Sequence, residues 1–108
     1  MSVINIKPLS INQAYRGRRF KTNEYKAYEE ELLWLLPKMK VPKTDLCLEI
    51  EVGLSSKLAD LDNVAKIFID CLQKKYSFND KEIYKIIMEK ELVKKGEEYI
   101  EFYIYQIE

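Results

Sequence analysis

The chain has 108 residues, of which 47% are hydrophobic, and its equal numbers of basic and acidic residues leave no net charge. This length and apolar content predict one domain with its own core, and no apolar run approaches the roughly 20 residues of a membrane span. The sequence contains no histidine, which excludes histidine-based nucleophilic, acid–base and metal sites. Any metal ion would therefore be held by oxygen, which favours Mg²⁺, Mn²⁺ or Ca²⁺.

The charges are unevenly distributed along the chain. Residues 1–28 carry six basic side chains and one acidic side chain, or 6 − 1 = +5, so the remainder carries −5. A basic arm can bind phosphate locally even when the total charge is zero. The N-terminus shows no signal-peptide pattern. Cys47 and Cys71 fall within apolar patterns, so we expect reduced, buried thiols in a cytoplasmic protein.

The N-terminal part predicts a short strand followed by a basic loop. Residues 3–7 have strand character, which Pro8 ends. Residues 9–21 show no consistent period, and four cations lie there within six residues, interleaved with Tyr15 and Phe20. Such cations can contact phosphates and such rings can stack on bases, but a solvated basic loop explains the same pattern.

The rest of the chain alternates helices and strands. Thr22 or Asn23 is expected to cap a helix that stops before Pro37. Residues 46–54 alternate with a period of two and form the clearest strand, and residues 60–76 return to helical spacing.

A strand over residues 82–93, a hairpin turn at residues 94–96 and a final strand over residues 98–107 complete the chain. The whole chain, residues 1–108, is thus predicted to be one small α/β (α+β) domain. It has a mixed sheet of about four strands and two main helices, in the order β-α-β-α-β-β.

Residues 60–66 (DLDNVAK) carry an unusual density of charge for a segment that leads into an apolar helical pattern. One explanation is structural: Asp60 or Asp62 caps the helix, the helix dipole favours the other, and Lys66 pairs with Asp62. The other explanation is functional. In extended backbone, residues i and i+2 point the same way, so Asp60 and Asp62 can converge on one cation.

Asp80, in the turn after the second helix, is the candidate third carboxylate. If the next strand lies beside the preceding one, we expect its start to return to the same end of the sheet as Asp60 and Asp62. Two or three carboxylates suffice to hold Mg²⁺, with Mn²⁺ as a substitute. A metal there would activate water and neutralise charge on a phosphodiester, while Lys66 would contact the scissile phosphate or the leaving oxygen.

The same residues carry a family resemblance. Residues 60–66 and residues 79–83 (NDKEI), with Asp70 between them, resemble the signature of RusA-type Holliday junction resolvases. Residues 8–16 (PLSINQAYR) are similar to that family's N-terminal Ser-x-Asn-x-x-Tyr segment. The resemblance spans most of the chain, with matching length and element order.

The resemblance implies a homodimeric, Mg²⁺-dependent endodeoxyribonuclease of DNA recombination and repair, often encoded by phages or prophages, that makes paired nicks across a four-way DNA junction. It assigns metal binding and catalysis to Asp60, Asp62 and Asp80, and a catalytic role to Lys66. The chain departs from the family at two places. Asn79 stands where an additional acid is often found, and residues 55–59 lack the arginine run that members can carry before the first aspartate.

We therefore predict a junction resolvase that needs neither a small-molecule cofactor nor a membrane. The residues expected to bind DNA all lie in the basic loop and are Asn12, Tyr15, Arg16, Arg18, Arg19 and Lys21. The main alternative is a non-catalytic junction- or DNA-binding module that uses residues 16–21 and keeps the aspartates only as helix caps. A third reading is an interaction protein with a fortuitous acidic turn.

Overall fold

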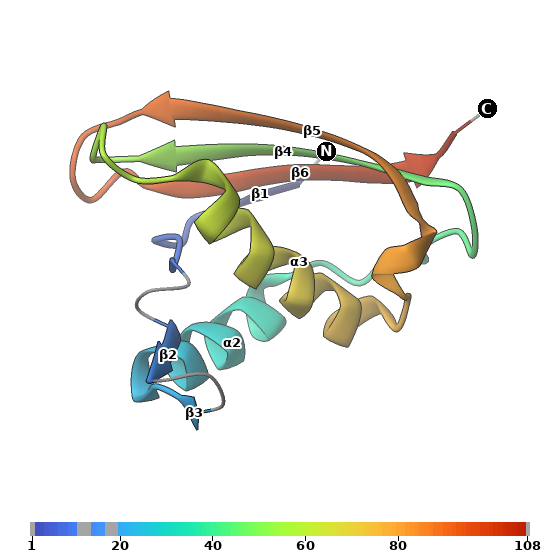
Figure 1. Cartoon of the computed structure of the whole chain (residues 1–108), viewed down its shortest axis with the longest axis horizontal. Coiled ribbons are helices and arrows are strands. Elements are labelled where there is room, and N and C mark those ends of the chain that lie inside the picture. Colours follow the sequence, from blue (N-terminus) through green and yellow to red (C-terminus); the bar gives the residue numbers. More distant parts are fainter. Residues whose placement is uncertain (1, 11–13, 17–19, 108) are drawn as a thin grey trace.

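The fold is a four-stranded mixed sheet with two helices packed on one of its faces (Figure 1). The computed structural model describes residues 2–10, 14–16 and 20–107. The strand order in the sheet is β1-β6-β4-β5, and the predicted α/β architecture and element order are confirmed. The elements are β1 (Ser2–Ile4), β2 (Tyr15–Arg16), β3 (Phe20–Lys21), α2 (Asn23–Leu35), β4 (Leu46–Leu54), α3 (Leu61–Tyr76), the 3₁₀ helix η1 (Asp80–Glu82), β5 (Ile83–Leu92) and β6 (Tyr99–Gln106).

β4 is the centre of the sheet, because it pairs in parallel with β5 and in antiparallel fashion with β6. Its alternate residues from Leu46 to Leu54 join the core under α3, as the period of two predicts. Across that core, the ring of Phe68 on α3 meets the ring of Phe102 on β6 edge to face at 5.5 Å. Burial of these apolar side chains fixes α3, and therefore its two ends, relative to the sheet.

The first helix, α2, begins and ends where the sequence predicts. Thr22 is its N-cap, and the Thr22 hydroxyl accepts a hydrogen bond of 3.1 Å from the Tyr25 amide. The helix ends two residues before Pro37. Glu29 ties this helix to its neighbours by ion pairs with Lys21 at 3.3 Å and with Lys74 of α3 at 2.7 Å.

Three details of the chain path differ from the sequence prediction. β1 is shorter than expected and covers Ser2–Ile4, and the basic loop contains the small β2–β3 pair. Residues 94–96 do form a turn, with Gly96 at a φ of +95°, but β5 and β6 do not form a hairpin. β4 lies between them, so each uses β4 as its neighbour instead of the other.

The sheet face opposite the helices is acidic. Glu51 on β4 is in register with Glu89 on β5 and with Glu101 on β6, which places three carboxylates in one row. The Tyr99 hydroxyl lies 2.9 Å from Glu51 and 3.1 Å from Glu91 on the same face. Burial and these two carboxylates raise the pKa of the Tyr99 hydroxyl, so it stays protonated as a donor. This face would repel a phosphate backbone.

Both cysteines are buried and free, as predicted. Burial raises the pKa of the Cys71 thiol to about 12, which keeps it protonated and unreactive at neutral pH. Among the described residues, no helix has the length and apolarity that crossing a membrane requires.

Candidate active site

Asp60 and Asp62 straddle the first residue of α3. Asp60 is the N-cap residue and has extended backbone (φ −83°, ψ 125°), whereas Asp62 already lies in the first helical turn. The expected extended geometry therefore holds for Asp60 alone. Asp60 makes no side-chain capping hydrogen bond, and its carboxylate instead accepts a 3.4 Å hydrogen bond from the side-chain Nδ2 of Asn63. Helix capping thus does not explain the Asp60 side chain.

Lys66 is exposed one turn after Asp62 and forms an ion pair with Asp70 at 3.2 Å. The structural explanation considered from the sequence, a pair between Lys66 and Asp62, is therefore wrong. No ion pair between described residues involves Asp60, Asp62 or Asp80. All three of these carboxylates are on exposed residues, where they are free to meet a cation.

The N-terminal segment reaches the start of α3. Asp60 and Asn63 line a pocket of about 430 Å³ together with Lys7, Ser10 and Ser56. Two regions that both belong to the resemblance described above therefore meet at one place. They are separated by about fifty residues in the sequence. Lys7 was not singled out from the sequence, because a single lysine beside a strand carries no local signal.

Asp80 is the first residue of η1, directly before β5. Its backbone amide donates a 2.9 Å hydrogen bond to the Gln73 side chain on α3, and the Asn79 side chain accepts a 3.0 Å hydrogen bond from the Lys81 amide. Asn79 is thus the N-cap of η1. These bonds fix the turn and hold the Asp80 carboxylate at the surface.

Within one chain, Asp80 does not return to the end of the sheet where Asp60 and Asp62 lie. β5 does lie beside β4, but the two strands run in parallel, with Leu46 paired to Ile83 and Leu54 paired to Leu92. Asp80 precedes the start of β5, whereas Asp60 follows the end of β4. The expectation of a common end is wrong because the next strand of a parallel pair starts at the end of the sheet where the first strand starts, opposite to the end where the first strand finishes.

The basic segment is described in part. Asn12, Arg18 and Arg19 lie outside the described residues, and Tyr15 and Arg16 form β2. Lys21 is described in full. Its ammonium group pairs with Glu29 at 3.3 Å and lies 4.7 Å from the centre of the Tyr25 ring. Any phosphate contact by Lys21 would therefore compete with contacts inside the protein.

The donor set suits a hard divalent cation only in part. Asp60 and Asp62 supply the carboxylate oxygens that Mg²⁺ prefers, and neither is in an ion pair with a described residue. However, residues 2–10, 14–16 and 20–107 contain no group of three acidic or thiol side chains that could hold a metal ion. Among the described residues, Asp60 and Asp62 are therefore not joined by a third such side chain.

Comparison with known proteins agrees with the sequence resemblance. Residues 7–103 match the family model described as Endodeoxyribonuclease RusA, and no curated protein matches the chain. The matched region includes the N-terminal segment, both ends of α3 and most of β6. Since it covers nearly the whole chain, this protein belongs to the RusA family of Holliday junction resolving endodeoxyribonucleases.

Proposed function

We propose that the protein is a homodimeric, Mg²⁺-dependent resolvase that makes paired nicks in four-way DNA junctions, with each active site shared between two chains. Asp60 and Asp62 of one chain act together with Asp80 of the partner subunit. The single observation that carries this proposal is the separation of these aspartates within one chain.

The separation is too large for a common metal ion. Asp62 is the second of the 16 residues of α3. The 16 − 2 = 14 helical residues that follow it rise roughly 21 Å at 1.5 Å per residue before the turn that carries Asp80. Carboxylate oxygens bind Mg²⁺ at only about 2.0–2.1 Å. Side-chain rotation cannot bridge that difference, which supports a third carboxylate supplied by another chain.

The edge strand β5 supports a specific dimer. Its outer edge is unpaired among the described residues, and on the helical side it exposes an apolar stripe made by Ile86, Met88 and Leu92, interrupted by Lys90. An exposed edge with an apolar stripe is suited to pairing with another chain. In a two-fold dimer, two β5 strands would pair in antiparallel fashion. The start of one β5, with Asp80, then lies beside the end of the other, near Asp60.

The residues at that shared site suit phosphodiester hydrolysis. A Mg²⁺ ion held by the three aspartates would supply an activated water and neutralise charge on the phosphate. Lys66 is placed one turn into α3 and is paired with Asp70 at the surface. An exposed pair of this kind contributes about 0–1 kcal/mol, so the ammonium can exchange Asp70 for a phosphate oxygen at little cost. There it stabilises the charge that develops as the bond breaks.

Mixing two inactive variants tests the shared site. In a dimer of Asp62→Asn with Asp80→Asn, a shared arrangement leaves one site with all three aspartates, whereas an arrangement within each chain leaves none. Co-expressed variants form about half mixed dimers by random pairing, so roughly a quarter of wild-type nicking should return. A synthetic four-way junction with labelled strands, incubated in Mg²⁺, measures this directly. Each variant alone is the control and should give no nicks.

The outcomes separate the competing functions. Nicks from the mixed dimer support the shared site, and paired nicks by the wild type support the resolvase. An inactive mixture beside an active wild type would show that each chain builds its own site. Junction binding without any nicks in the wild type would instead support the DNA-binding module.

A further inference from the structure

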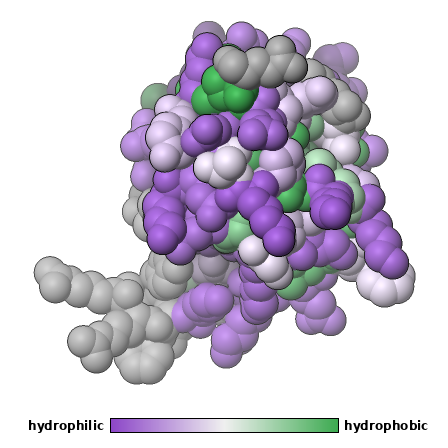
Figure 2. All heavy atoms as spheres, turned by 90° about the vertical axis from the view of Figure 1, so that its right-hand side faces the viewer, coloured by the Kyte–Doolittle hydropathy of each residue, from purple (hydrophilic) through white to green (hydrophobic). Residues whose placement is uncertain are grey.

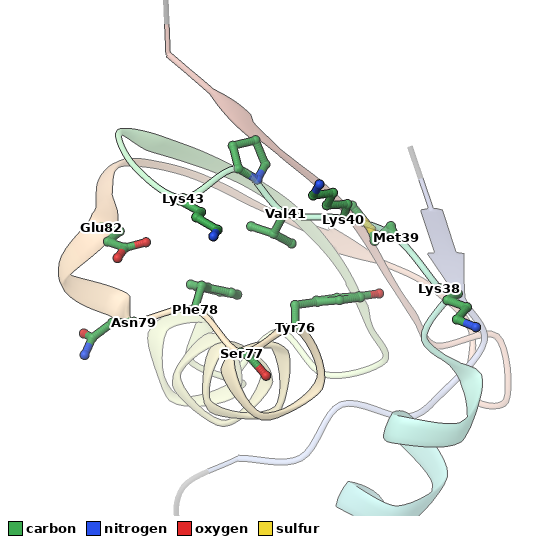
Figure 3. A pocket seen from close by; sticks show the side chains of 11 residues that line it. Lys38, Met39, Lys40, Val41, Lys43, Tyr76, Ser77, Phe78, Asn79 and Glu82 are labelled. Carbon is green, nitrogen blue, oxygen red and sulfur yellow. The ribbon is translucent and has the colours of Figure 1, made fainter.

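A pocket of about 960 Å³ lies at the end of α3 that carries Asp80 (Figure 3). One wall is formed by the end of α3 and the following turn, from which the rings of Tyr76 and Phe78 project into the pocket. The other wall is the linker between α2 and β4, including Val41 and Pro42. A space of this size with an aromatic wall accommodates one flat, polar group such as a nucleobase with its sugar.

The two walls are tied together by hydrogen bonds. The Tyr76 hydroxyl donates a 2.6 Å bond to the Pro37 carbonyl, and burial raises the pKa of this hydroxyl, so it remains a donor at neutral pH. The Lys75 ammonium donates a 2.9 Å bond to the Leu33 carbonyl of α2. The pocket is therefore held open by the fold itself, and a ligand does not have to order it.

The rim of the pocket is basic. Lys38, Lys40 and Lys43 line it against one acidic residue, Glu82, which gives the lining a charge of 3 − 1 = +2. No ion pair between described residues uses these three lysines. This end of the molecule is mainly hydrophilic, with apolar side chains set between the polar ones (Figure 2). The positive rim contrasts with the acidic open face of the sheet, so an anionic chain would favour this end.

The pocket adjoins the candidate catalytic residue Asp80. Asn79 and Glu82, on either side of the Asp80–Lys81 pair in sequence, both line it. A DNA strand whose phosphate reaches Asp80 would therefore pass the pocket within a nucleotide or two. Base-paired DNA cannot place a base there, because its bases are stacked inside the duplex.

We propose that this pocket binds one unpaired nucleotide of the DNA strand at the junction. The base stacks on Phe78, and the lysines of the rim hold the neighbouring phosphates. This subsite rests on the proposed nuclease function, since it takes its substrate from the strand that Asp80 meets. It favours strands that are open at a branch point over continuous duplex, and it combines an aromatic platform with a basic groove, as single-strand binding surfaces do.

Binding of short single strands, without divalent cation, tests the proposal. Fluorescence anisotropy would compare a labelled dT octamer with an octamer that has the same phosphates but no bases. The base-containing strand should bind the wild type about tenfold more tightly, since stacking of one base contributes on that order. In Phe78→Leu, this preference should fall to below about threefold. Trp34→Leu, which removes an exposed ring outside the pocket, should keep the preference.

The lysines provide a second measurement that does not depend on a partly buried side chain. Replacing Lys38, Lys40 and Lys43 together by Gln should lower the slope of log K against log salt by about 2, because each phosphate contact to a single strand contributes about 0.7. Lys85→Gln, on the acidic face, should leave the slope unchanged. An unchanged slope in the triple variant overturns the proposal. So does equal binding of the two octamers by the wild type, or a full base preference in folded Phe78→Leu.

These binding measurements are independent of junction cleavage. Equal binding of the two octamers by a wild-type protein that nicks junctions would rule out the nucleotide subsite but still support the resolvase function. Base-dependent binding by a wild-type protein that never nicks a junction would rule out the proposed nuclease function and support a pocket that binds single-stranded DNA.

Discussion

Glu29 is a single side chain that joins three elements of the fold. From α2 it pairs with Lys21 of β3 and with Lys74 of α3, and its own side chain is mostly covered. Burial alone would raise the pKa of the Glu29 carboxyl, but the hydrogen bonds from Lys74 and Lys21 outweigh burial and lower it below 4.5. The folded protein therefore favours the ionised form.

That lowered pKa makes a prediction for Glu29→Gln. Because the folded-state pKa lies below the unfolded value, ionised Glu29 stabilises the protein above about pH 4.5, and this contribution disappears as the pH falls through the folded-state pKa. The substitution should cost about 1 kcal/mol at pH 7 and progressively less in more acidic solution. Urea unfolding at several pH values measures this, with Glu30→Gln on the same helix as the matched control. A cost that stays constant with pH would contradict the role of the charge.

At the scale of elements, β4 is where local pattern and final structure agree best. The alternation over residues 46–54 predicts its bounds, because a strand between two neighbours must bury every second side chain under α3. Thr22 likewise identifies the start of α2, since a cap acts on amides only three residues away. Signals of this kind are contained in the few residues that form the element.

The predictions that the structure contradicts concern how the strands are ordered and directed relative to one another. The turn at residues 94–96 is visible in the sequence, but which strand each arm pairs with is decided by β4, which lies forty residues earlier. The sequence correctly predicts that Asp80 lies in a turn after the second helix. The end of the sheet at which this turn lies is determined by the direction of β5, which runs parallel to β4. Strand order and direction are set by packing of the whole chain, and no local spacing encodes them.

β4 also contains one close approach that can be tested. Gly53 lies beneath the ring of Tyr99 on β6, and a Cβ atom at residue 53 would collide with that ring. Gly53→Ala should therefore destabilise the fold by about 1–3 kcal/mol by displacing Tyr99 from Glu51 and Glu91. Thermal melts of a double-mutant cycle measure the coupling.

The destabilisation caused by Gly53→Ala should disappear or change sign when the Tyr99 ring is removed. In a Tyr99→Ala background the collision is absent, and alanine then restricts the unfolded chain more than glycine does, so Gly53→Ala should be neutral or stabilising by up to about 1 kcal/mol. An equal loss of stability in both backgrounds would show that the Tyr99 ring is not the cause.

At the scale of the whole molecule, charge and shape divide the protein into sides with different roles. The open sheet face carries the row of Glu51, Glu89 and Glu101, while the basic pocket rim and both groups of candidate catalytic aspartates belong to the helical side. The unpaired edge of β5 lies between these two sides. A dimer formed along this edge would keep the helical sides of both chains on one common surface, because a two-fold axis perpendicular to the sheet preserves its faces.

The edge of β5 therefore makes the last prediction, on the oligomeric state. Ile86 is 44% exposed in the apolar stripe, and lysine is well tolerated on a free edge strand, so Ile86→Lys should fold but place two charges in the dimer interface. Light scattering after size-exclusion chromatography should show a dimer for the wild type and a monomer for the variant. Junction nicking should be lost with the dimer, since each shared site loses its Asp80. Trp34→Lys, which changes an 87% exposed residue on α2, should remain dimeric and active. If the dimer persists in Ile86→Lys but is lost in Trp34→Lys, the interface lies on α2 and not on β5.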